Sequence, residues 1–148
     1  MDLETLIAER EIAAQLVRFA RAMDARDWPA CLGILTPDAT AEFGTGLLEG
    51  ADEIVAQIRG YLDVCGPTQH LLGSILVDVD PGGDRATSRA YVSDTHLGRG
   101  TRSELTFSTL GDYHDGWVRT DDGWRLAHRL KHSHAVLGTF DVFARDDT

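Results

Sequence analysis

The chain has 148 residues, 43% of them hydrophobic and 26% charged, which suits one compact domain able to bury a core without disulfides or metals. A formal net charge of −10 makes phosphate backbones and anionic lipid surfaces poor partners, so neither nucleic acid nor a membrane is expected to bind. No apolar run approaches the roughly twenty residues of a membrane span, and the acidic first residues do not resemble a secretory signal.

Helical periodicity dominates the first part of the chain. Apolar residues at three- and four-residue steps predict an amphipathic helix from about residue 4 to 25. Asp27 can cap a short second helix that has Pro29 in its first turn, and "TAEFGTGLLEG" is typical of a short strand and turn. A third helix is predicted over 51–61, with Gly66 and Pro67 ending it.

From residue 68 the period of the pattern changes to two. Strands are predicted at about 68–79, 85–98, 104–119 and 124–134, separated by the turn clusters "DPGGD", "GRGTR" and "TDDG". The first of them is apolar enough to be buried on both faces. Long antiparallel strands in a small sheet must twist and curl. We therefore expect an α+β fold, with a strongly curved, mostly antiparallel sheet that the helices close into a cone, and the cone is the default ligand pocket.

Two residues within this pattern are candidates for chemistry. Asp24 falls at the margin of the apolar stripe of the first helix, where a carboxylate must be paired or hydrogen-bonded. It could equally cap the turn into "ARDW". His70 lies in an apolar strand, where a histidine is often satisfied by one backbone carbonyl. A carboxylate within reach of its ring would instead make it a general base near neutral pH.

The later strands add polar groups at alternate positions. Trp124 and Leu126 are predicted core residues, and simple alternation puts Arg129 on the opposite face from them. The histidines of the last strand are spread over about 20 Å at strand rise, too far to close on one ion together, so no metal site is predicted. Cys31 and Cys65 have neither a disulfide framework nor metal-ligand spacing, which favours reduced thiols in a cytoplasmic protein.

Several segments together carry a resemblance to a known family. "LVRFARAMDARDW", "GPTQHLLGS", "RATSRAYVSDTHLGRG" and "GDYHDGWVRTDDGWRLAHR" resemble the SnoaL-like group of the nuclear transport factor 2-like superfamily, over about residues 5 to 135. Within that group the segments are most similar to the branch that contains scytalone dehydratase and hexachlorocyclohexane dehydrochlorinase. The fold hosts many unrelated functions, so the resemblance is more specific for architecture than for activity.

The resemblance implies a cone-shaped α+β barrel, in one SnoaL-like domain over 1–148 with a disordered tail from about residue 142. It implies a catalytic pair of Asp24 and His70, with Arg129 where the dehydrochlorinase carries an active-site arginine. Phe19 stands where that enzyme has a lysine, which argues against halide abstraction. The residues expected to contact a substrate are Phe19, Met23, Trp28, Phe43, Tyr61, Leu72, Tyr91, His96 and Tyr113.

The expected function is a cofactor-independent lyase or isomerase, dehydratase-like, acting on a small hydrophobic cyclic molecule. A polyketide-cyclase-like enzyme uses the same parts and stays open, as does a non-catalytic ligand-binding or assembly subunit of the same fold. The segment "HAVLGTFDVF" is too apolar for a free tail, and apolar residues on the sheet face opposite the cone predict a homo-oligomer, either a dimer or a trimer.

Overall fold

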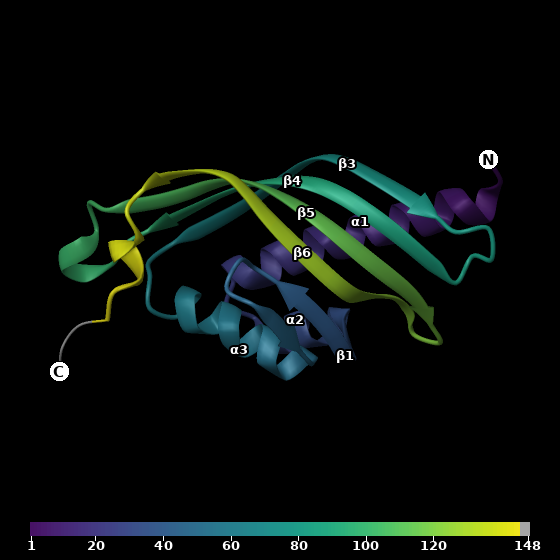
Figure 1. Cartoon of the computed structure of the whole chain (residues 1–148), viewed down its shortest axis with the longest axis horizontal. Helices are drawn as coiled ribbons and strands as arrows, with labels where there is room; N and C mark the ends of the chain where they lie inside the picture. Colours follow the sequence, from purple (N-terminus) through teal and green to yellow (C-terminus); the bar gives the residue numbers. More distant parts are fainter. Residues whose placement is uncertain (146–148) are drawn as a thin grey trace.

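The computed structural model describes residues 1–145 as helices packed on a curved sheet (Figure 1). The helices are α1 (Leu3–Asp24), α2 (Trp28–Ile34) and α3 (Ala51–Leu62), with short 3-10 helices η1 (Gly100–Arg102) and η2 (Phe140–Phe143). The strands are β1 (Leu35–Glu42), β2 (Leu47–Glu49), β3 (Thr68–Val79), β4 (Arg85–Leu97), β5 (Thr106–Thr120) and β6 (Gly123–Gly138). Their order in the single six-stranded sheet is β2-β1-β6-β5-β4-β3, and β1 runs parallel to β6. The α+β architecture is confirmed, although the sheet stays open.

The helix ends follow the local chemistry of the sequence. The Asp2 carboxylate accepts a hydrogen bond from the backbone N–H of Thr5 at the start of α1. Asp27 caps α2 in the same way, through the N–H of Ala30, and Pro29 lies in the first turn. These caps satisfy N–H groups that have no partner within the helix. The short α2 turns the chain back over α1 and feeds it into β1.

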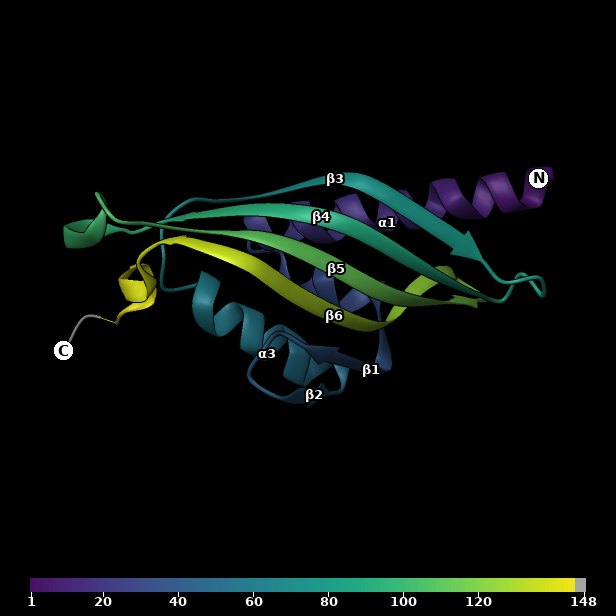
Figure 2. The same cartoon turned by 45° about the horizontal axis from the view of Figure 1, so that its top comes forward.

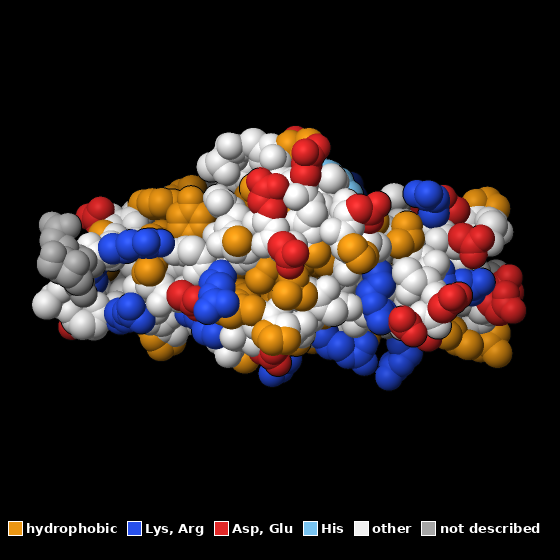
Figure 3. All heavy atoms as spheres, turned by 90° about the horizontal axis from the view of Figure 1, so that it is seen from below, with side chains coloured by type: hydrophobic (Ala, Val, Ile, Leu, Met, Phe, Trp, Pro, Cys, Tyr) orange, Lys and Arg blue, Asp and Glu red, His pale blue; other side chains and the backbone are white. Residues whose placement is uncertain are grey.

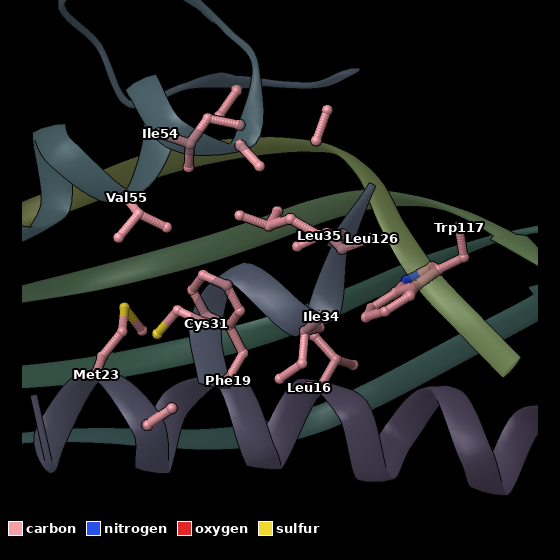
Figure 4. Close-up of a cluster of buried hydrophobic side chains, with 14 of the residues drawn as sticks. Leu16, Phe19, Met23, Cys31, Ile34, Leu35, Ile54, Val55, Trp117 and Leu126 are labelled. Atoms are coloured by element: carbon pink, nitrogen blue, oxygen red, sulfur yellow. The ribbon is translucent and has the colours of Figure 1, made fainter. Parts of the chain in front are cut away.

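Strands β3 to β6 form an arch, with α2, α3 and β1 beneath it and α1 running along β3 (Figures 1 and 2). Side chains from the helices and the sheet meet in one core below the arch (Figure 4). Leu16, Phe19 and Met23 project from α1 into this core. Trp117 and Leu126 reach down to it from β5 and β6. This packing fixes the helices against the concave face of the sheet.

Strand β3 is half-buried, so the expectation that both of its faces are buried is wrong. It is the edge strand of the sheet, next to β4 only. Leu71 is 61% exposed and Leu76 is 64% exposed, whereas His70 and Leu72 face inward. The pairing with β4 shifts between Gly73 and Leu76, where Ser74 has a left-handed φ of 48°. This bulge kinks the edge strand and changes which alternate residues face inward.

A bulge in β6 likewise overturns the alternation predicted for that strand. Trp117 pairs with Leu126 and Gly116 pairs with His128, so Ala127 is an extra residue in β6. Leu126 and Arg129 are both buried, although they were expected on opposite faces. One inserted residue reverses the side on which the following side chains lie, here as far as His134, which is a second extra residue in β6. The bulge therefore turns the charged side chains of Arg129 and Lys131 toward the concave side of the sheet.

The C-terminal segment is ordered further than expected. Residues 140–143 form η2, and Val142 is 1% exposed, so a disordered tail does not begin at residue 142. The prediction of a tail for residues 146–148 lies outside the described residues. Phe140 and Phe143 each pack edge-on against Phe107 of β5, and their own rings lie in a tilted contact with centroids 5.0 Å apart. This aromatic cluster closes one end of the arch.

Seen from below, the molecule shows acidic and basic side chains interspersed, with apolar side chains surfacing between them (Figure 3). The convex side of the sheet also exposes apolar residues, among them Leu71, Leu110 and Tyr91. None of the helices among residues 1–145 combines the length and the apolar character needed to cross a bilayer.

Candidate functional site

Asp24 and His70 meet beneath the arch. Asp24 ends α1, and His70 lies near the start of β3, which packs on that helix. The His70 ring Nδ1 lies 2.7 Å from Asp24 Oδ1, and the His70 backbone N–H donates to Asp24 Oδ2 at 3.0 Å. The His70 side chain is 6% exposed and that of Asp24 is 23% exposed. His70 therefore contacts both oxygens of the Asp24 carboxylate, one through its ring and one through its backbone.

Arg26 and Thr68 position this carboxylate from behind. Arg26 has a left-handed φ of 56° and donates to the carbonyls of Met23, Leu62 and Gly66, which tie together the ends of α1 and α3 and the start of β3. Its Nη1 also donates to Thr68 Oγ1 at 2.7 Å. Since Arg26 has only donors, Thr68 must accept from it and direct its own hydroxyl hydrogen to Asp24 Oδ1, at 2.8 Å.

The protonation states of the pair follow from these contacts. Burial raises the pKa of Asp24, but hydrogen bonds from the ring and backbone of His70 and from Thr68 outweigh it, so the pKa lies below its usual value. An ionised Asp24 only accepts hydrogen bonds, so the proton between the two groups belongs to His70 Nδ1. The unprotonated Nε2 of a neutral His70 is then available as a base.

His96 lies beside His70, with ring centroids 5.5 Å apart. Its Nδ1 lies 3.1 Å from the carbonyl oxygen of Phe107, which can only accept, so Nδ1 carries a hydrogen. Burial lowers the pKa of His96, and the nearby Asp94 carboxylate offsets this only in part. His96 is therefore neutral at pH 7, with its Nε2 unprotonated.

A second ionic cluster faces the two histidines. Asp94 of β4 accepts hydrogen bonds from the Thr109 backbone N–H at 2.8 Å, from the Thr109 hydroxyl at 2.7 Å and from Lys131 Nζ at 2.5 Å. Lys131 also donates to Thr109 Oγ1 at 3.0 Å. Burial raises the pKa of Asp94, but Lys131 and Thr109 outweigh burial and hold it below the usual value. The carboxylate is ionised and paired.

Asp94, His70 and His96 also offer a possible metal-ligand set. One nitrogen from each histidine and one carboxylate oxygen lie within 4.8 Å of one another. Nitrogen and oxygen donors of this kind suit a divalent transition metal, and each Nδ1 has the type of partner that orients a ligating histidine. However, the Lys131 ammonium already occupies Asp94 and would repel a dication. The residues present thus fit a metal poorly.

A cavity of about 300 Å³ lies under the arch, between α3, η2 and the sheet. His70, His96, Asp94 and Lys131 form its polar side. Its apolar side comes mainly from α3 and from the aromatic cluster at the end of the arch, namely Ile58, Tyr61, Leu62, Phe107, Phe140 and Phe143. The volume is at the lower end of the range for small-molecule sites, which suits a compact ligand.

The predicted contact residues separate into two groups. Met23, Phe43, Tyr61, His96 and Tyr113 line the cavity. The other predicted residues lie elsewhere. Phe19 and Trp28 are buried in the core, where Trp28 Nε1 donates to Asp63. Leu72 packs against the edge of the core. Tyr91 is 58% exposed on the convex side of β4 and does not line the cavity.

Arg129 lies at the cavity wall but is engaged with a carboxylate. Its Nε and Nη2 donate to the two oxygens of Asp115, each at 2.9 Å, and both side chains are almost fully buried. Its Cζ lies 3.8 Å from the ring centroid of Tyr113. Burial lowers the pKa of Arg129, but Asp115 outweighs it and raises the pKa. This geometry makes Arg129 a support for the wall.

Sequence reasoning missed Lys131, Asp94 and Thr109, as well as the aromatic cluster. Simple alternation would put Lys131, like Arg129, on the face opposite Trp124 and Leu126, because the bulge at Ala127 leaves no clear mark in the sequence. Asp94 and Thr109 sit on strands whose pairing register cannot be read from one chain. The apolar character of the segment around Phe140 and Phe143 predicts oligomerisation, whereas in the structure the two rings line the cavity.

Comparisons with known proteins agree with this architecture. A family described as "SnoaL-like domain" matches residues 4–130. An uncharacterized protein of Mycobacterium tuberculosis is 32% identical over 126 residues, which cover 82% of each chain. Two crystal structures from Novosphingobium aromaticivorans share the fold. A putative scytalone dehydratase matches with a TM-score of 0.84 and 18% identity, covering 94% of this chain and 92% of that one.

The second, a putative aromatic ring hydroxylase, matches with a TM-score of 0.83 and 23% identity, covering 94% of this chain and 98% of that one. At these identities the structural likeness establishes the fold alone. The match over most of the chain and the mycobacterial relative establish more than that. The chain belongs to the SnoaL-like family, within the nuclear transport factor 2-like fold, as its motifs predicted.

Proposed function

We propose that this protein is a cofactor-independent lyase or isomerase that acts on a small hydrophobic cyclic molecule. The observation that carries the proposal is the Asp24–His70 pair, with the ring 2.7 Å from the carboxylate at the edge of a largely apolar cavity. An imidazole held by a carboxylate is a base suited to removing a proton from carbon next to a carbonyl. The dehydratase name of one structural neighbour is in keeping with this chemistry.

In the proposed reaction His70 Nε2 takes the proton from the carbon next to the carbonyl, and the C–H electron pair moves into an enolate. Asp24 stabilises the imidazolium that forms. In an elimination, the enolate expels hydroxide from the neighbouring carbon, and His70 returns its proton so that water leaves. In an isomerisation, the same proton returns to another carbon of the substrate. Both outcomes restore the starting enzyme.

The apolar walls assist this chemistry in two ways. Tyr61, Phe107 and Phe143 exclude water from the base, which preserves the strength of the Asp24 interaction. They also offer flat faces to a ring-shaped substrate. A cyclase would place the enolate carbon against a second carbonyl and form a carbon–carbon bond. The same base and the same cavity would serve it.

The test follows proton abstraction directly. The protein is incubated in D₂O with a panel of cyclic ketones and hydroxy-ketones, and ¹H NMR follows both deuterium incorporation and loss of water. We expect His70→Ala and Asp24→Asn to slow exchange by roughly 10²–10⁴-fold. Gln69→Ala, one residue away on the exposed face of β3, serves as the matched control and should leave the rate unchanged.

A non-catalytic binding subunit would give a different result. In that case panel compounds would raise the melting temperature of the protein, while exchange stayed at the rate of the protein-free solution. The His70 and Asp24 variants would then change affinity alone. Such an outcome, with every variant still folded by circular dichroism, would reject the lyase or isomerase proposal.

A further inference from the structure

The Lys131 side chain crosses a whole strand to reach the cavity. Lys131 on β6 pairs with Tyr113 on β5, whereas Asp94 on β4 pairs with Thr109 on β5. The lysine therefore extends over β5 to place Nζ on Asp94 and Thr109. A Cβ at Gly111, which lies on β5 beneath the lysine, would come within 3.0 Å of Lys131 Cε and 2.8 Å of Val92 Cγ1. The glycine leaves the space through which the lysine passes.

Stability alone does not account for the ion pair between Lys131 and Asp94. The Asp94 side chain is 1% exposed and that of Lys131 is 18% exposed, so both charges have lost most of their hydration. Removing two ions from water costs several kcal/mol, and their attraction seldom returns more than that. A buried ion pair on the wall of a cavity is instead typical of a functional site.

Lys131 has a donor left for a ligand. Its ammonium has three N–H groups, and among residues 1–145 its hydrogen bonds to Asp94 and Thr109 use two of them. Lys131 and Asp94 both line the cavity that His70 lines. Asp94 in turn has an oxygen within 4.8 Å of a ring nitrogen of His70 and of His96. An oxygen atom bound to Lys131 and a carbon atom beside the His70 ring could therefore belong to the same small cyclic ligand.

We propose that Lys131 binds the oxygen of a neutral carbonyl or hydroxyl group and stabilises the negative charge that develops there when His70 takes a proton. This inference rests on the proposed function, because it takes His70 as the base. A pre-placed ammonium on a largely buried wall costs little reorganisation at the moment of reaction. Its hydrogen bond strengthens as the oxygen becomes an enolate, so it favours the transition state over the bound ketone.

The charges on the wall argue for a neutral ligand in place of a carboxylate. Asp94 already neutralises Lys131, and Asp24, behind the His70 ring, adds a further negative charge near the cavity. A carboxylate ligand would have to displace Asp94 from the ammonium and leave that buried anion unpaired. A carbonyl or hydroxyl oxygen needs only the remaining N–H. The substrate class is accordingly a cyclic ketone, enol or phenol.

Arg129 is less suited to this role. Two of its nitrogens donate to Asp115, and the Tyr113 ring covers its guanidinium. Its side chain is 4% exposed, against 18% for Lys131. An incoming oxygen would have to part the arginine from both neighbours. Lys131 can bind a ligand oxygen while it keeps its ion pair with Asp94.

Phenols test the inference because a phenol of falling pKa mimics an oxygen that gains negative charge. The affinities of 2-naphthol and of ring-substituted phenols are measured by calorimetry for the wild type and for a double variant, Asp94→Asn with Lys131→Met. The double change removes both charges together, so no buried ion is left unpaired. Naphthalene, which has the same shape without the oxygen, is the control ligand.

For the wild type we expect affinity to rise as the phenol becomes more acidic, and 2-naphthol to bind more tightly than 2-naphthoate. The double variant should lose roughly tenfold in affinity for 2-naphthol and none for naphthalene, and the dependence on acidity should flatten. Gly111→Ala, which crowds the lysine chain, should lose a smaller factor in the same direction. Thermal unfolding checks that each variant is folded.

Two results would overturn the inference: equal losses for naphthalene and 2-naphthol in the double variant, or tighter wild-type binding of 2-naphthoate than of 2-naphthol. The His70→Ala variant separates this inference from the proposed function. Its binding of 2-naphthol should persist, since Lys131 and Asp94 are untouched. Failure of deuterium exchange would reject the base while the phenol series still reports on Lys131.

Discussion

The two ends of the concave sheet face use the same strands for different purposes. At one end Trp117, Trp124 and Leu126 fill the space between the sheet and α1, and each is at most 2% exposed. At the other end the same strands β5 and β6 present Thr109 and Lys131 to a hollow. Between the two ends lies the bulge at Ala127. Packing stabilises the first end, and the second is left open for a ligand.

The difference shows how charge is distributed along this face. Three carboxylates of low exposure lie on or directly behind the wall of the open half, and each has its own partner: Asp24 with His70, Asp94 with Lys131, and Asp115 with Arg129. Guanidinium and ammonium groups have no free lone pair, whereas a neutral imidazole has an unprotonated ring nitrogen that can accept a proton. Only the first of these three pairs can therefore both accept and return a proton in the proposed reaction.

The largest expected effect belongs to the packed end. Trp117 is 1% exposed, and its Nε1 donates to Ser88 Oγ at 2.8 Å. Trp117→Ala should lower the free energy of unfolding by about 4 kcal/mol, because it opens a void and leaves the Ser88 hydroxyl unpaired. Urea denaturation measures the loss. Affinity of the remaining folded protein for 2-naphthol should be unchanged, and a parallel loss of affinity would show that the two ends are not separate.

Arg129→Met should cost about 3 kcal/mol of unfolding free energy, because it leaves the Asp115 carboxylate buried without its cation. Adding Asp115→Asn should restore most of that loss, since neither charge then remains. If Arg129 only supports the wall, the double variant keeps most of its deuterium-exchange activity. A restored fold with abolished exchange would instead place Arg129 among the residues that touch the substrate.

Thr68→Val tests the support behind the base. It removes the hydroxyl that donates to Asp24 Oδ1 and accepts from Arg26, while it keeps the side-chain shape. The rate of exchange should fall roughly tenfold, because the carboxylate loses one of its hydrogen bonds and its orientation. Thr68→Ser retains the hydroxyl and should restore the rate. Equal rates for the valine and serine variants would contradict the role assigned to Thr68.

Acid should weaken the cavity end in two steps. The pKa of His96 is lowered by burial from the ordinary value of 6.5, so the unfolded chain takes up this proton first as pH falls. Stability from His96 is present above pH 6.5 and declines as pH falls through the folded pKa. The pKa values of Asp24 and Asp94 are lowered from 3.8, and their contribution is lost below that value.

Urea titrations at a series of pH values measure both steps. His96→Gln should remove the decline that begins near pH 6.5 and leave the one below pH 3.8 in place. A decline near pH 6.5 that persists in the His96→Gln variant would assign it to another group.

The smallest expected effect on unfolding comes from the convex side of the sheet. Leu71 and Leu110 lie in one row across the sheet, through Ser93, and both are more than half exposed. We expect wild-type sedimentation to give a mass above that of one chain, since exposed apolar rows of this kind favour self-association. Leu71→Lys with Leu110→Lys should reduce the mass to that of one chain with little change in unfolding energy. A single-chain mass for the wild type would disprove the expected oligomer.

Much of the fold could be predicted from the sequence because its signals are local. The cap at Asp27, the three- and four-residue spacing of α1 and the turn clusters between the strands all act within a few residues. The pair of Asp24 and His70 could be suggested only through the family resemblance. The helix and the strand that bring the two residues together are joined by forty-odd residues whose path no local rule fixes.

The direction in which the remaining side chains face depends on strand register and strand order. Whether Arg129 and Lys131 face inward is decided by one unpaired residue, Ala127, and alternation alone gives the opposite answer. The exposure of Leu71 and Leu76 followed from the edge position of β3, which is a property of the strand order. The contribution of Phe140 and Phe143 to the cavity required the chain to fold back after β6, a turn that includes Gly138 at φ 84°.

Because of the extra residue at Ala127, substitutions in the two halves of β6 have separate consequences. Before Ala127, a substitution changes packing in the core. After Ala127, it changes the groups that are available to bind a ligand. A relative that lacked this one residue would keep the equivalents of Trp117 and Trp124 in its core, while the equivalent of Lys131 would face solvent. Strand length, as much as residue identity, would then decide whether such a relative can do chemistry.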